Sequence, residues 1–108
     1  MKIIKIFKSR NNIEPFTKWF NSIKNLRVRA IIKTRLDRLA GGNYGDYKLI
    51  DNNLYELRIH LSPGFRIYYG ELQDKIVILL IGGTKNSQAK DIKKAKHYWQ
   101  VYMENGYE

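Results

Sequence analysis

Residues 54–85 constrain the fold of this chain more than any other part of its sequence. They contain three strand-like runs, over residues 54–60, 64–69 and 76–83, and turn-forming residues separate them at Ser62-Pro63-Gly64 and Gln73-Asp74. The third run is apolar on both faces, which predicts a strand inside a sheet. Isolated cations interrupt the apolar background at Arg58 and Arg66. Strands that only build a core rarely contain arginine, so these positions are candidates for function.

The first half of the chain predicts one strand followed by two helices. Residues 2–8 form the strand, and Pro15 suits the first turn of the helix that follows it. An apolar stripe with helical spacing supports that helix, at Phe16, Trp19, Phe20 and Ile23. A second helix is predicted from about Leu26 to Ala40, where Gly41-Gly42 ends it.

Two loops and a final helix complete the prediction. Residues 43–53 are expected to form a loop, and so are residues 82–85. Asn86 or Ser87 can cap the last helix, and Gly106 is expected to end it. Its inner stripe is predicted to include Ala89, Ile92, Ala95 or Lys96, Trp99, and Tyr102 or Met103.

These elements predict an α+β fold in a single domain spanning residues 1–108. A chain of 108 residues fits one domain. The expected order is strand, helix, helix, three strands and helix. The strands would form a twisted, mainly antiparallel four-stranded sheet, with two N-terminal helices and a C-terminal helix packed on it.

Composition limits the classes of partner and compartment. The chain has 20 Lys and Arg against 10 Asp and Glu, a net charge of +10, which exceeds the magnitude of about 2–8 that solubility requires. This excess predicts a nucleic acid or an acidic protein as partner. The absence of cysteine excludes disulfides and thiolate chemistry. No apolar run approaches a membrane span and no signal peptide is recognised, so we expect a soluble, cytoplasmic protein without a membrane partner.

Strand register predicts where the cations lie. A hairpin loop with an odd number of residues, 62–64, would pair Leu61 with Phe65. An even loop would bury an arginine among apolar side chains, which is costly. With the odd loop, one face of the sheet carries Glu56, Arg58, His60, Arg66 and Tyr68.

Arg58, Arg66 and Lys85 are therefore predicted to form a basic patch, with His60 and Tyr68 nearby. Arginine suits phosphate because its planar fork donates to two oxygens. Lys85 lies beside the amide end of the last helix, where anions bind readily. The same side chains also have structural explanations, since Arg58 can pair with Glu56 or Asp46, Tyr68 can pack at a rim, and His60 can be a surface residue.

Other site chemistries find no support in the sequence. The two histidines are far apart and lack carboxylate companions, so no metal is expected. Residues 82–87 lack the Gly-Lys-Ser/Thr order of a phosphate-binding loop, and no other cofactor is expected. Neither a nucleophilic triad nor a pair of carboxylates for sugar hydrolysis can be assembled.

Three motifs resemble the RelE/ParE toxin superfamily, and in particular its HigB-like branch of phage-derived addiction module killer proteins. They are Tyr55-Glu56-Leu57-Arg58, the run from Pro63 to Tyr69, and the run from Gly82 to Gln88 with Asp91-Ile92 behind it. The order of elements is also that of this family. The resemblance covers nearly the whole chain.

The resemblance implies a toxin of a type II toxin–antitoxin system that cuts mRNA on the ribosome without a metal. The 2′-hydroxyl would attack the scissile phosphate and leave a cyclic phosphate. By position, Arg66 matches the strand arginine that stabilises the transition state, Arg58 a basic position on the preceding strand, and Lys85 the basic loop after the last strand. Implied partners are a cognate antitoxin with a helix-turn-helix, the ribosome and mRNA, and operator DNA only through the antitoxin.

The sequence departs from the RelE pattern in its last helix. A catalytic tyrosine is expected near residues 89–92, and none is present. His60, Tyr68 or Lys85 would then have to transfer protons. Two alternatives therefore stay open, a ParE-like inhibitor of DNA gyrase and a non-catalytic nucleic-acid-binding module.

Overall fold

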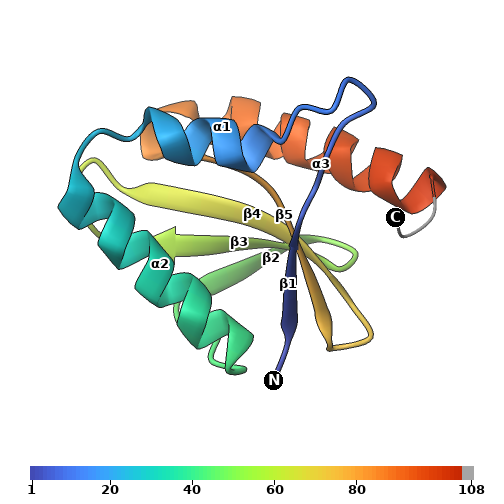
Figure 1. The fold of residues 1–108 in the computed structure, drawn as a ribbon, viewed down its shortest axis with the longest axis horizontal. Helices are drawn as coiled ribbons and strands as arrows, with labels where there is room; N and C mark the ends of the chain where they lie inside the picture. Colours follow the sequence, from blue (N-terminus) through green and yellow to red (C-terminus); the bar gives the residue numbers. More distant parts are fainter. Residues whose placement is uncertain (106–108) are drawn as a thin grey trace.

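The computed structural model describes residues 1–105 and contains one five-stranded sheet flanked by helices (Figure 1). The expected C-terminal stop at Gly106 lies outside the described residues. The elements in chain order are β1 (Ile3–Ile6), α1 (Pro15–Ser22), α2 (Leu26–Ala40), β2 (Tyr47–Asp51), β3 (Leu54–Ile59), β4 (Phe65–Leu72), β5 (Ile76–Thr84), the short 3-10 helix η1 (Lys85–Ser87) and α3 (Gln88–Glu104).

The predicted α+β class is confirmed, but the sheet has five strands rather than four. Its order is β1-β5-β4-β3-β2, with β1 parallel to β5 and every other pair antiparallel. As predicted, the apolar strand β5 lies inside the sheet, between β1 and β4.

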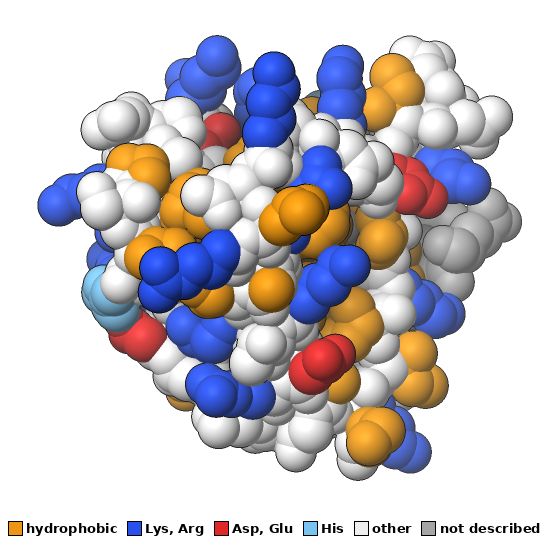
Figure 2. Space-filling model, turned by 60° about the vertical axis from the view of Figure 1, so that its left-hand side comes forward, with side chains coloured by type: hydrophobic (Ala, Val, Ile, Leu, Met, Phe, Trp, Pro, Cys, Tyr) orange, Lys and Arg blue, Asp and Glu red, His pale blue; other side chains and the backbone are white. Residues whose placement is uncertain are grey.

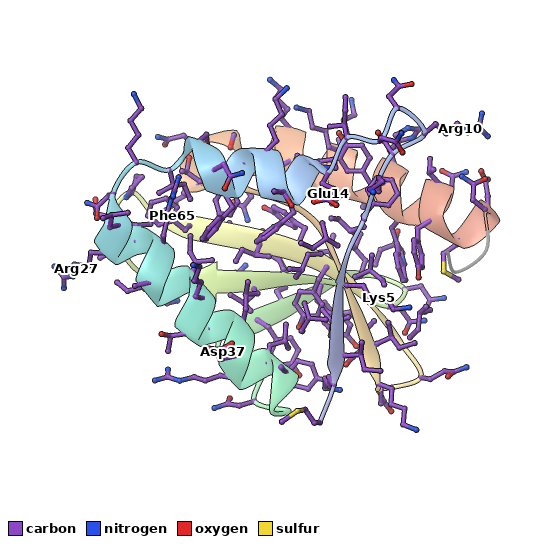
Figure 3. All side chains as sticks on the ribbon, in the orientation of Figure 1. Lys5, Arg10, Glu14, Arg27, Asp37 and Phe65 are labelled. Carbon is purple, nitrogen blue, oxygen red and sulfur yellow. The ribbon has the colours of Figure 1, made fainter. Side chains whose placement is uncertain are left out.

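Two apolar clusters cover the two faces of the sheet. One joins α1 and α2 to the sheet through side chains such as Phe16, Ile32 and Ile67. The other joins α3 to the opposite face through residues such as Trp99 and Leu80. Figure 3 shows Phe65 projecting from the start of β4 into the layer beneath α1 and α2. Burial on both faces explains why β4 and β5 contain so few exposed residues.

The prediction of a loop over residues 43–53 was wrong, because Tyr47–Asp51 form the edge strand β2. Tyr47 pairs with Leu57 and Leu49 with Tyr55 on β3. Rings from the supposed loop pack on β3, with Tyr47 and Tyr55 centroids 5.8 Å apart. Asn53, at φ 57°, closes the tight connection between the strands. Turn-forming residues on both sides of this short strand concealed it in the sequence.

The register between β3 and β4 differs from the predicted pairing, but it still places Arg58 and Arg66 on the same face of the sheet. Phe65 pairs with Ile59 and not with Leu61. The loop is longer than expected because the Leu61 N–H turns back to the Ile59 carbonyl, at 3.0 Å, and so leaves the ladder. The loop, residues 60–64, still has an odd number of residues, so Arg58 pairs with Arg66 on the face opposite to Leu57 and Ile67.

The end of β5 and the start of α3 also differ from the prediction. Gly82 to Thr84 belong to β5, so residues 82–85 do not form a loop. η1 intervenes before α3, whose N-cap Ser87 makes no side-chain capping bond. Ala89 is exposed and does not join the inner stripe, whereas Asp91 is buried one turn from Ala95. No described helix has the length and apolarity to cross a bilayer.

Candidate phosphate-binding site

A buried carboxylate organises the charged face that the strand register predicted. Glu56 on β3 is fully buried and accepts hydrogen bonds from Arg58 Nε at 2.9 Å, Tyr68 OH at 2.8 Å and Gln88 Nε2 at 2.9 Å. A buried carboxylate is costly unless charged and polar donors surround it, as they do here. We call Glu56, Arg58, Arg66, Tyr68 and Gln88 the Glu56 cluster.

Arg66 has an unusual place in the Glu56 cluster. Its side chain is only 13% exposed, and its Nε lies 3.6 Å from Glu56 Oε2, too far for a hydrogen bond. Nε is buried without a hydrogen-bond partner among the described residues. Two arginines share one carboxylate, so the cluster keeps an uncompensated positive charge. A nearly buried guanidinium whose Nε donor is unused among the described residues is suited to bind an anion.

Lys85 lies at the edge of the Glu56 cluster. Its backbone N–H donates to the Gly64 carbonyl at 2.9 Å, which joins the β3–β4 loop to the start of η1. A Cβ atom at Gly64 would lie 3.4 Å from Arg66 Nη1 and 3.5 Å from Lys85 Cβ. Gly64 also has φ +90°, which side chains rarely adopt. Arg66 and Lys85 therefore flank the same bare turn, as the predicted patch requires.

Arg58 and His60 are anchored by Asp46 from the loop before β2. The Arg58 backbone N–H donates to the Asp46 carbonyl at 2.9 Å, and the Arg58 carbonyl accepts from Arg35 Nη1 at 2.7 Å. His60, with 74% of its side chain exposed, pairs with the Asp46 carboxylate and not with the Glu56 cluster. His60 therefore lies beside the patch, and Asp46 restrains its ring.

The electrostatics of the Glu56 cluster differ for its two acids. Burial alone would raise the pKa of Glu56, but hydrogen bonds from Arg58, Gln88 and Tyr68 outweigh it and hold that pKa below the ordinary value. Burial, followed by the hydrogen bond to Glu56, raises the pKa of the Tyr68 phenol far above normal. Tyr68 is therefore neutral and fully buried, and it orients Glu56.

The depressed pKa of Glu56 predicts a stability that falls in acid. Its contribution is complete above the unfolded value of 4.5 and is lost as the pH falls through the lower folded value. Glu56→Gln is therefore expected to be less stable than wild type at pH 7. Its free energy of unfolding should also change less with pH between about pH 6 and pH 3. Urea denaturation at several pH values measures this. Glu104→Gln, which removes an exposed carboxylate outside the Glu56 cluster, is the control, and an unchanged slope in Glu56→Gln would contradict the proposed pairing.

The sequence did not single out Gln88 or a central role for Glu56. Gln88 is the first residue of α3 and reaches across to β3, a contact of 32 residues' separation that has no local sequence signal. Among the described residues, no three His, Cys, Asp or Glu side chains are grouped so that they could hold a metal ion.

Comparison with known proteins gives one informative relative. No family model matches the sequence. The chain is 46% identical over 81 residues to a protein of Haemophilus influenzae described as uncharacterized. The alignment spans 75% of this chain and 82% of that protein. The chain belongs to the family of this Haemophilus protein. Identity this high over most of both chains indicates that the two proteins share one fold, while the relative's description assigns no activity.

Proposed function

We propose that this protein is the toxin of a type II toxin–antitoxin system and cuts mRNA on the ribosome. The observation that carries the proposal is Arg66, which is nearly buried between Glu56 and the turn at Gly64 and whose Nε donates no hydrogen bond to any described residue. Arg58 and Lys85 add positive charge on either side. Figure 2 shows one face of the molecule, on which Lys and Arg side chains clearly outnumber acidic ones. Such a surface suits a polyanionic backbone.

In the proposed reaction, Arg66 binds the non-bridging oxygens of the scissile phosphate. The 2′-hydroxyl oxygen attacks phosphorus, the bond to the 5′ oxygen breaks, and the products are a 2′,3′-cyclic phosphate and a 5′-hydroxyl. One proton leaves the 2′-hydroxyl and one reaches the departing oxygen. Negative charge accumulates on the phosphoryl oxygens, so preorganised cations supply the main catalytic contribution. His60 and Lys85 are the candidates for proton transfer, since buried Tyr68 donates to Glu56.

A second candidate function is a nucleic-acid-binding module that does not cut. It is favoured by the engagement of the expected proton-transfer groups, because His60 pairs with Asp46 and Tyr68 with Glu56. Such a module would bind RNA in a salt-dependent manner without producing new ends.

Expression of the wild-type chain in a bacterial host, followed by mapping of mRNA 5′ ends, tests the proposal. New ends within translated codons, appearing together with growth arrest, are the expected result. An inhibitor of translation initiation, added after the chain has accumulated, should stop new ends from appearing, because cutting requires ribosomes on the message. Growth arrest accompanied by DNA damage and intact mRNA would instead identify a gyrase inhibitor. Neither arrest nor new ends, with RNA binding retained, would identify the non-catalytic module.

A further inference from the structure

A cavity beside η1 is lined by none of the residues of the Glu56 cluster. It has a volume of about 620 Å³ and lies at the end of β5, between residues of α1 and α3. β1 pairs with β5 only from Ile76 to Leu79, whereas β5 continues to Thr84. The last part of β5 thus has a strand partner only on its β4 side within the described chain. We call this space the α1–α3 cavity.

Two adjacent glycines shape the α1–α3 cavity. A Cβ atom at Gly82 would lie 2.2 Å from the Trp19 ring, and one at Gly83 would lie 1.8 Å from the Asp91 carboxylate. The bare backbone lets Trp19 approach from one face of the sheet and Asp91 from the other, and both line the same space at the end of β5, beyond its pairing with β1. The partly buried Trp19 supplies an aromatic wall, and Lys18 and Lys94 also line the space.

Asp91 is the group that points to a ligand. Asp91 is buried, with 6% of its surface exposed, and Ser87 Oγ donates a hydrogen bond to its Oδ2 at 2.5 Å. No other hydrogen bond and no ion pair to it occurs among the described residues, although an ionised carboxylate can accept about four hydrogen bonds. A buried carboxylate with spare acceptor capacity is costly unless a donor reaches it. A ligand with N–H donors would offset that cost.

The charges around the cavity define the chemistry of that donor. Lys18 and Lys94 line the same space, so a cationic amine would be repelled while an anionic molecule would be attracted. A neutral amino group on an anionic, aromatic molecule satisfies all three features: the carboxylate, the lysines and the indole. The amino group of a nucleobase on a phosphate chain has this chemistry.

We propose that the α1–α3 cavity binds one base of single-stranded RNA, with its amino group donating to Asp91 and its ring packing on Trp19. The inference rests on the proposed RNA-directed function and adds base selectivity to it. Gly83 pairs with Arg66 across β4 and β5, and Lys85 follows Thr84, a residue of the cavity wall. A strand whose phosphate is held by Arg66 therefore has a neighbouring nucleoside within reach of the cavity.

The cavity should prefer adenine and cytosine over uracil. Adenine N6 and cytosine N4 carry two N–H donors, whereas uracil presents the acceptor O4 at the same edge and would face the carboxylate with like charge. Stacking on an aromatic side chain tolerates any base, so the preference has to come from Asp91.

Fluorescence titration with uncleavable RNA tests this inference. The probes are tetranucleotides of 2′-O-methyl adenosine, cytidine or uridine, which lack the attacking hydroxyl. Adenosine and cytidine tetramers should quench Trp19 and bind about tenfold more tightly than the uridine tetramer. Trp19→Phe should remove the quenching, which separates it from the signal of buried Trp99. Asp91→Asn should reduce the preference to about threefold or less, and the exposed Lys93→Ala should preserve it.

Equal affinity for the three tetramers, or no quenching by any of them, would overturn the inference. These outcomes need no variant, so they stand even if Asp91→Asn does not fold. If the α1–α3 cavity binds a peptide strand instead of a base, none of the tetramers should quench Trp19. If mRNA is not cut but the base preference is present, cleavage alone fails; if mRNA is cut without a base preference, only this inference fails.

Discussion

Replacing Arg66 by alanine is expected to lower mRNA cleavage by about 100-fold or more, and to abolish growth arrest on expression. The guanidinium is the group that would meet the charge developing on the phosphate, and its Nε donates no hydrogen bond within the described part of the chain. Glu56 keeps its hydrogen bonds from Arg58, Tyr68 and Gln88 in the variant. The fold should therefore survive, and the measured loss should be one of chemistry.

Arg66→Lys and Lys93→Ala provide the matched comparisons. Lysine keeps the charge but not the two-pronged donor geometry, so Arg66→Lys should fall between wild type and Arg66→Ala. Lys93 is an exposed cation of α3, and its removal changes the net charge by the same amount. End mapping and growth curves measure activity, and circular dichroism measures folding. Wild-type cleavage by folded Arg66→Ala would eliminate the proposed role of this arginine.

The Glu56 cluster was partly predictable because strand parity is a local property. Side chains alternate across a strand, so the residues that share a face follow from any odd loop between β3 and β4. The predicted loop length was wrong and the pairing of Leu61 was wrong with it, yet Arg58 and Arg66 still became neighbours. The free-energy cost of burying an unpaired guanidinium also excludes Arg66 from the apolar face of the sheet.

The parts that sequence did not predict depend on contacts between distant segments. β2 has few residues, and its Tyr47 packs on Tyr55 of β3, a contact that the residues of β2 alone do not reveal. The burial of Asp91 depends on Gly83 being bare on the facing strand. A carboxylate on a helix is usually exposed, so the predicted inner stripe included Ala89 and did not include Asp91.

Gly70→Ala is expected to destabilise the fold by about 3 kcal/mol. A Cβ atom at this position of β4 would lie 2.3 Å from the Trp99 ring, so the ring would have to move. Trp99 is 7% exposed, stacks on Tyr102 with ring centroids 5.6 Å apart, and donates from Nε1 to the Asn52 carbonyl at 3.2 Å. Displacing it would disturb the packing of α3 on the sheet and the connection between β2 and β3 together.

Gly82→Ala should cost less, about 1 kcal/mol, although its Cβ atom would approach Trp19 just as closely, at 2.2 Å. The difference lies in the ring, because Trp19 is only partly buried and borders the α1–α3 cavity, into which it can shift. Gly41→Ala is the control: its φ of −78° suits alanine and the nearest atom would be 3.4 Å away, so stability should rise by up to about 1 kcal/mol. Urea denaturation gives the three free energies of unfolding. Equal decreases in the free energy of unfolding of Gly70→Ala and Gly82→Ala would contradict this explanation. They would mean that the Trp19 ring cannot move into the α1–α3 cavity to make room for the added methyl group.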